Sequence, residues 1–139
     1  MTTVSPVLPI SFDGRFSVYC YWQSHGLLLL RSFESARSPK RLEILFRDVL
    51  WMSIPAWLTG LTVEVSPVQP LLAQLPVALH REALLRRGFA LRSEGATSYI
   101  VCGTVQRGED NCGYFEPSAL THEIPTGRLT IVGGVRESR

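Results

Sequence analysis

The chain has 139 residues, of which 45% are hydrophobic and 19% charged, and its formal net charge is +2. This length predicts a single domain over residues 1–139 that buries a core without a disulfide framework or structural metal. So small a net charge indicates no nucleic-acid partner and no anionic membrane partner. The cysteines number three and lack the close spacing of a metal or redox motif, which favours free thiols in a cytoplasmic protein.

The first third of the chain is predicted to form strands. Residues 1–9 contain two prolines and little periodicity, which indicates an extended arm with no signal peptide. Residues 15–33 are typical of a β-hairpin, with alternating residues in 16–22, a turn at 23–26 and then four leucines. A run apolar on both faces favours a strand that is covered on both sides. We therefore expect this hairpin at the centre of the fold.

The next segment, residues 41–54, is also apolar and alternating. Its pattern shifts phase at Arg47 and Asp48, which predicts a β-bulge or bend, with a tight turn between two strands as the alternative. Residues 57–60 are expected to form a loop, and residues 61–65 show clean strand alternation.

Residues 76–87 are the best helix candidate, because apolar triplets recur about two turns apart. Glu82 and Arg86 form an i,i+4 pair in the favourable order, and Gly88 is expected as a left-handed cap. Beyond the helix we expect a hairpin over residues 89–92 and 98–105, a polar loop over 107–113, a helical turn over 118–122, a last strand over 128–132 and a frayed tail over 133–139.

Together these elements predict a mainly β fold, or an α+β fold. The strands are expected to be antiparallel and to form a sandwich or a strongly bent sheet, with one α-helix near residues 76–87. Open sheet edges have to be covered, so self-association as a homodimer is one expectation.

No motif in the sequence determines a chemistry. The acidic residues Glu109 and Asp110, with Asn111 and Glu116 nearby, lack the alternating spacing of a calcium loop and are interpreted as a solvated turn. We predict no metal site and no cofactor. An enzyme or metal site would require the fold to gather polar residues that are far apart in the sequence: His25, Glu109, Cys112 and His122.

The positive charges near the predicted helix form one candidate binding site. Arg81, Arg86 and Arg87, with Arg92 just beyond, could meet an acidic partner or a phosphate. The simpler interpretation is a solvated helix end, since charge runs usually do no more than this.

Large aromatic residues form the other candidate site. Trp51, Trp57, Tyr19 and Tyr21 would form a binding surface if a bent sheet carried them to its concave side. The favoured interpretation is that they fill the core, with Trp57 the most exposed of the four.

The function expected from these observations is a small cytoplasmic binding or protein-interaction domain without catalytic activity, acting on a protein partner or on a second copy of itself. A small enzyme or metal-binding protein is the alternative. A partner-neutralising protein of the immunity type is a weaker one, because it needs only a complementary surface.

Overall fold

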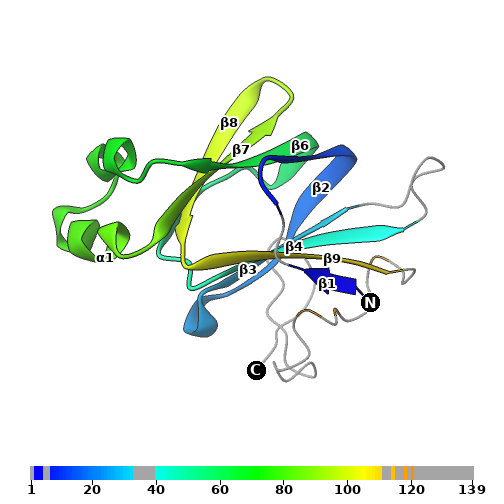
Figure 1. Cartoon of the computed structure of the whole chain (residues 1–139), viewed down its shortest axis with the longest axis horizontal. Coiled ribbons are helices and arrows are strands. Elements are labelled where there is room, and N and C mark those ends of the chain that lie inside the picture. The colour runs from blue at the N-terminus through cyan, green and yellow to red at the C-terminus, as the bar shows by residue number, and fades with distance from the viewer. Residues whose placement is uncertain are drawn as a thin grey trace.

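The computed structural model describes residues 2–4, 7–32, 40–110, 114, 118 and 120, and these residues form a mainly β domain (Figure 1). In this part of the chain nine strands form one sheet in the order β1-β9-β4-β3-β2-β6-β7-β8-β5, and every strand pair is antiparallel. The predicted fold class is confirmed. The strands are β1 (Thr2–Val4), β2 (Ile10–Trp22), β3 (Leu27–Ser32), β4 (Arg41–Arg47), β5 (Trp51–Ser53), β6 (Trp57–Ser66), β7 (Arg87–Ser93), β8 (Ala96–Cys102) and β9 (Thr104–Asp110).

The sheet is strongly bent, and the long strand β2 forms the bend. Its first half pairs with β6, from Ile10 opposite Val63 to Ser17 opposite Trp57. Its second half pairs with β3, and the register shifts once in each half. Such irregularities increase the local twist. The sheet therefore folds into two layers that share β2, one containing β3, β4, β9 and β1 and the other containing β6, β7, β8 and β5 (Figure 1).

The main core lies between the two layers. Alternate residues of each strand point inward, so leucine, valine, isoleucine and phenylalanine side chains from six strands pack together. Phe46 and Phe89, from opposite layers, meet with ring centroids 6.1 Å apart. The buried members of this core are Phe16, Leu28, Leu30, Ile44, Phe46, Leu58, Leu61, Val63, Phe89, Leu91, Ile100 and Cys102.

The outer faces of the two layers also carry apolar clusters. On β2, β3 and β4 a second cluster contains Trp22 and Leu29 and is contacted by Leu120. On β8 a third cluster packs Val101 against Ala83 of the helical segment. All six residues of β3 are buried. The prediction that the hairpin is covered on both faces is therefore confirmed.

Two sharp corners connect the layers at one end of the molecule. At the first, Asp48 has φ 58°, and the chain turns there from β4 into β5. The chain therefore ends one strand and begins another here, which agrees with the alternative prediction of a turn between two strands and not with a bulge or bend within one strand. At the second corner, Gly103 separates β8 from β9 and donates its N–H to the carbonyl of Arg47 at 2.9 Å. The prediction of one uninterrupted strand over residues 98–105 is therefore wrong.

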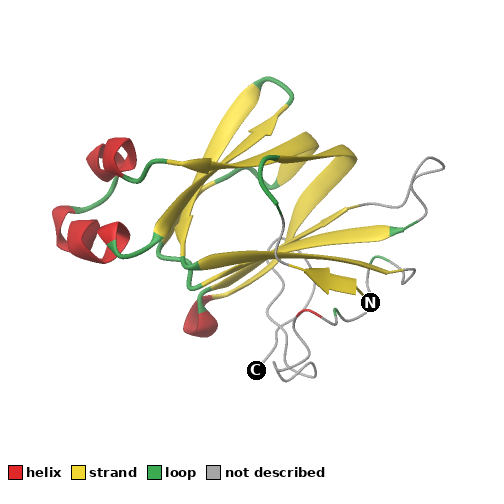
Figure 2. Ribbon diagram, in the orientation of Figure 1, coloured by secondary structure: helices red, strands yellow, loops and turns green. Residues whose placement is uncertain are grey.

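The helical segment is shorter than predicted. The α-helix α1 (His80–Leu84) follows two short 3-10 turns, η2 (Gln69–Gln74) and η3 (Val77–Leu79), and a third turn, η1 (Gln23–His25), lies in the hairpin (Figure 2). Gly88 does not cap a helix, because it lies in β7 opposite Val101. Within the described ranges, no helix has the length and apolar character needed to cross a bilayer.

Three other segments differ from the sequence prediction. Residues 57–60 are not a loop but the start of β6, paired with β2. The expected polar loop does not begin at Arg107, because β9 extends to Asp110 along β4, and residues 111–113 lie outside the described residues. Within the predicted arm over residues 1–9, residues 2–4 form the strand β1, which pairs with β9. The predicted last strand over 128–132 and the tail over 133–139 lie outside the described residues.

Candidate functional site

One hollow in the described structure lies between the two layers of the sheet. It lies between the end of β6 and the start of β7 in one layer and the start of β9 in the other. Its volume is about 210 Å³. We call it the open-side pocket, and its lining includes Leu8, Val65, Arg87, Phe89, Thr104 and Val105.

The wall of the open-side pocket exposes polar and apolar surface in similar amounts. Phe89 is buried and belongs to the main core, whereas Val65 is 63% exposed at the rim. Arg87 is the only charged residue in the lining, and its side chain forms no ion pair or hydrogen bond with any described residue. The pocket thus combines apolar side chains with one unpaired positive charge.

The size of the open-side pocket limits what it can hold. Ligand sites for cofactors and drug-sized molecules are typically about 300–1,000 Å³, and 210 Å³ is below that range. An apolar cavity of about 150 Å³ accepts benzene. The open-side pocket therefore fits one aliphatic or aromatic side chain better than a whole cofactor.

Next to the pocket, residues 69–85 form a helical lobe that projects from the ends of β6 and β7 (Figure 1). Its inner side packs on β8 through Leu71, Leu75 and Ala83. Its outer side carries Val77, Leu84 and Leu85, which are 81%, 51% and 75% exposed.

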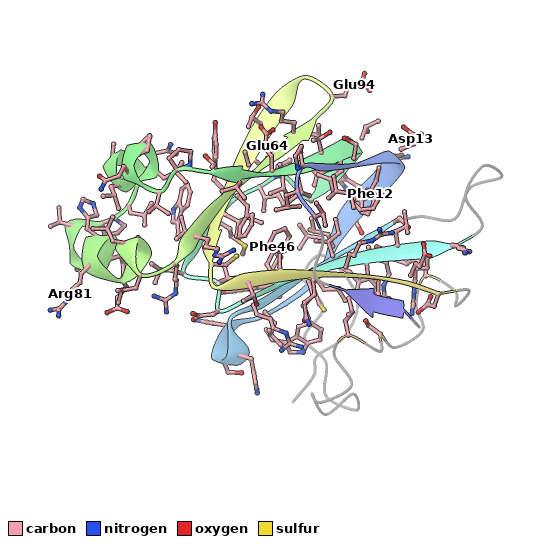
Figure 3. The ribbon with its side chains drawn as sticks, in the orientation of Figure 1. Phe12, Asp13, Phe46, Glu64, Arg81 and Glu94 are labelled. Atoms are coloured by element: carbon pink, nitrogen blue, oxygen red, sulfur yellow. The ribbon has the colours of Figure 1, made fainter. Side chains whose placement is uncertain are left out.

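These exposed residues share one side of the lobe. Arg81, Leu84 and Leu85 follow the i, i+3, i+4 spacing of one helical face, and Val77 lies about one turn before Arg81, in the 3-10 turn η3. We call these four residues the lobe stripe. Arg81 lies in its middle, is exposed and has no ion pair among the described residues; Figure 3 shows its side chain pointing away from the sheet.

Arg86 behaves differently from the other two predicted arginines. Its guanidinium contacts Asp48 at 3.0 Å and Glu82 at 3.3 Å, and the hydrogen bond with Asp48 is the main cause that raises the pKa of Arg86. The contact fastens the end of the helical lobe to the first corner of the sheet. Of the three arginines, therefore, only Arg81 and Arg87 are available to a partner.

The four aromatic residues are not gathered into one surface. Tyr19 is buried in the second cluster, where the Arg31 guanidinium stacks over its ring at 3.6 Å. Tyr21 packs on the main core and Trp51 packs on the third cluster. Trp57 is 53% exposed, as expected, and the Arg15 guanidinium lies 5.1 Å from its ring centroid.

The residues of the enzyme alternative are only partly described. His25 lies in the turn between β2 and β3, whereas Glu109 lies opposite Leu42 near the other end of the β4–β9 pair. Cys112 and His122 lie outside the described residues. Glu109 faces Lys40 and Arg107 at 3.8 and 3.7 Å, so it is not the freely solvated residue expected from the sequence.

Sequence reasoning missed a buried ionic network on the outer face of β3, β4 and β9. Glu43 accepts from Arg31 at 2.7 Å and from the Ser118 hydroxyl at 2.7 Å. Arg41 binds both carboxylate oxygens of Asp110, at 2.7 and 2.9 Å. Arg31, Arg41 and Glu43 are at most 1% exposed. Two positive and two negative charges compensate one another, so this network holds the structure together and presents no reactive group.

The Cys102 thiol is another polar group without free reactivity. It belongs to the main core, as predicted from its strand pattern, and burial raises its pKa to about 12. Thiolate, not thiol, is the nucleophile and the metal ligand. Across the described positions, no three His, Cys, Asp or Glu side chains gather in an arrangement that would hold a metal ion.

No protein-family model, no curated protein and no solved structure matches this chain. Inference about its function therefore starts from the helical lobe and the open-side pocket.

Proposed function

We propose that this domain is a protein-interaction module without catalytic activity, and that it binds an apolar, acidic segment of a different protein through the lobe stripe. The observation that carries the proposal is the exposure of Val77, Leu84 and Leu85 on one face of a helical segment. An apolar helical face normally packs against the protein's own core. Exposed apolar patches with polar surroundings are typical of interaction sites.

The energy available from this face is sufficient for recognition. Complete burial of a valine or leucine side chain contributes about 1.5–3 kcal/mol. The three aliphatic residues of the lobe stripe are between half and four-fifths exposed, so a partner that covers them gains several kcal/mol before entropic costs.

Arg81 favours a particular kind of partner. It lies in the middle of the lobe stripe, so antiparallel pairing of two copies about a two-fold axis would bring the two Arg81 guanidinium groups together. Like charges at the centre of an interface are unfavourable. A segment with a carboxylate between apolar side chains would instead pair with Arg81. We therefore propose a different protein as the partner, in preference to a homodimer.

The state of the described cysteines supports two further parts of the proposal. Cys20 and Cys102 are buried free thiols, which agrees with a protein of the reducing cytoplasm. Because Cys102 stays protonated and the buried charges compensate one another, neither supplies a nucleophile, which supports a binding role rather than catalysis.

Site-specific photocross-linking in the native cells tests the proposal. A benzophenone amino acid is placed at Leu85 in the lobe stripe or, as a matched control, at the exposed Thr97 of β8. We expect one dominant adduct from position 85 and none from position 97, and the cross-linked partner peptide should contain Asp or Glu. Arg81→Glu should abolish the adduct, whereas the exposed Arg92→Glu should not.

Equal adducts from positions 85 and 97, or an adduct that persists in Arg81→Glu, would contradict a specific site at the lobe. An adduct with a second copy of the chain would replace the heterologous partner with a homodimer.

A further inference from the structure

The open-side pocket places several apolar side chains and the Arg87 guanidinium around a space of the size of one amino-acid side chain. Arg87 lies opposite Cys102 in the pairing of β7 with β8, and the chain then turns through Gly103 to Thr104. Arg87, Phe89, Thr104 and Val105 all line the same space of about 210 Å³, and Arg87 and Phe89 lie on the same face of β7.

We propose that the open-side pocket binds the C-terminal residue of a polypeptide, with an apolar side chain inside the pocket and the free carboxylate on Arg87. An arginine guanidinium matches a carboxylate with two parallel hydrogen bonds. No carboxylate lines the pocket to compete with the ligand.

The closeness of the charge and the apolar side chains favours a chain terminus over an internal acidic residue. In a C-terminal residue the carboxylate and the apolar side chain are attached to the same Cα. In an internal segment, the carboxylate of a Glu or Asp and the apolar side chain belong to two different residues. If these residues are adjacent in an extended strand, their side chains point to opposite sides. A pocket that fits one side chain and holds one arginine therefore matches a terminal residue.

This inference has a different physical basis from the proposed function. The lobe stripe is an exposed apolar face centred on Arg81, whereas the open-side pocket is a hollow between two layers with Arg87 at its wall. Each can fail without the other, and the variants below distinguish them.

Amide NMR titration of the full chain with short probe peptides tests the inference. The probes are N-acetyl-Ala-Ala-Leu with a free carboxylate and the same peptide with a C-terminal amide. We expect the free acid to shift the amide signals of Gly103, Thr104 and Val105, and the amidated peptide to bind at least about tenfold more weakly, because a charge-assisted pair is lost.

Two arginine variants locate the binding. Arg87→Gln should weaken the free acid at least about tenfold, and Arg87→Lys should have an intermediate effect because it retains the charge but not the bidentate geometry. Arg92→Gln is the control, since Arg92 is also an exposed arginine of β7 but does not line the pocket. It should leave the affinity unchanged.

Four results would overturn the assignment. These are equal binding of the amidated peptide, absence of any shift at millimolar peptide, a loss of affinity in Arg92→Gln instead of Arg87→Gln, and equally tight binding of 4-methylpentanoate. The last result would indicate a site for a small apolar acid rather than for a polypeptide terminus.

Discussion

Cys102 shows how burial changes the chemistry of a single side chain. Its thiol lies in the main core next to the Asp48 carboxylate, and burial, with a smaller contribution from that charge, raises its pKa from about 9 to about 12. The folded state therefore holds the thiol proton over a pH range in which the unfolded state releases it. The contribution of this thiol to the free energy of unfolding is therefore fully present below pH 9, and it is lost as the pH rises toward 12.

This linkage predicts a difference between the wild type and Cys102→Ala. One pKa unit corresponds to about 1.4 kcal/mol, so between pH 8 and pH 10.5 the wild type should lose about 2 kcal/mol more unfolding free energy than the variant. Urea denaturation at both pH values measures it. Other groups titrate in both proteins and cancel in the comparison. Parallel pH profiles would show that the Cys102 thiol is not shifted.

Glu43 is the residue on which the buried ionic network depends. Its carboxylate pairs with the Arg31 guanidinium and accepts a hydrogen bond from the Ser118 hydroxyl. The Arg41 guanidinium lies 3.9 Å from the same carboxylate. Glu43→Gln leaves buried guanidinium charge without its partner, which typically costs about 3–5 kcal/mol. We expect a loss of this size in the free energy of unfolding, measured by urea denaturation.

The matched control for that substitution is Glu64→Gln. Glu64 also pairs with an arginine, Arg92, but that arginine side chain is 61% exposed. Exposed pairs contribute about 0–1 kcal/mol. If the two variants lose similar stability, the network at Glu43 is not the buried, compensated cluster described above.

At this scale the sequence predicts which side chains share a face but not which ones meet. The alternation in residues 41–47 places Arg41 and Glu43 on one side of a strand. The partners Arg31 and Asp110 become evident only when the pairing of β4 with β3 and β9 is known. These contacts join residues far apart in the sequence, so the local pattern contains no signal for them.

At the scale of elements, periodicity predicted the strands better than the helix. The hairpin over residues 15–33 and the turn at Asp48 follow from alternation and from its interruption. The helix over residues 76–87 was predicted too long, because pairing with β8 takes its last residue, Arg87, into β7. Sheet hydrogen bonds there outweigh the weak local preference for helix.

Gly88 provides the test of that correction. A Cβ at this position would lie 2.4 Å from the carbonyl oxygen of Ser66 on the neighbouring strand. A backbone carbonyl cannot rotate out of the way as a side chain can. The methyl group added by Gly88→Ala therefore has to move β7 away from β6. We expect a loss of about 3 kcal/mol, at the upper end of overpacking costs, in urea denaturation.

Gly60→Ala separates this steric effect from the backbone cost of a glycine substitution. Gly60 has φ 65° and no atom within 4 Å of an added Cβ, so only the left-handed conformation is penalised, by about 1–2 kcal/mol. A smaller loss in Gly88→Ala than in Gly60→Ala would argue against the close approach of β6 and β7.

At the scale of the whole molecule, the helical lobe projects from the sheet where β6 ends and β7 begins (Figure 1), and residues of these two strand ends also line the open-side pocket. The sequence predicted the arginines of this region as a candidate site, but it could not separate them. Their roles depend on the strand order. This order brings Arg86 into an ion pair with Asp48 and places Arg87 in the lining of the open-side pocket. The alternating pattern alone also did not show that the aromatic residues are divided among several surfaces.

The edges of the sheet bear on whether the whole molecule associates with itself. Both strands at the ends of the described sheet, β1 and β5, are three residues long. Very short edge strands are one way in which proteins prevent edge-to-edge pairing. Together with Arg81 in the middle of the lobe stripe, this weakens the sequence-based argument for a homodimer.

We therefore predict that the isolated protein sediments as a monomer of 15.5 kDa from micromolar to near-millimolar concentration. The same reasoning predicts that Arg81→Leu, which removes the central like charge and extends the apolar stripe, increases self-association. Sedimentation velocity of both proteins at matched concentrations measures the effect. A wild-type dimer would overturn the electrostatic argument for a different partner. A monomeric Arg81→Leu variant would show that repulsion at Arg81 is not what keeps the copies apart.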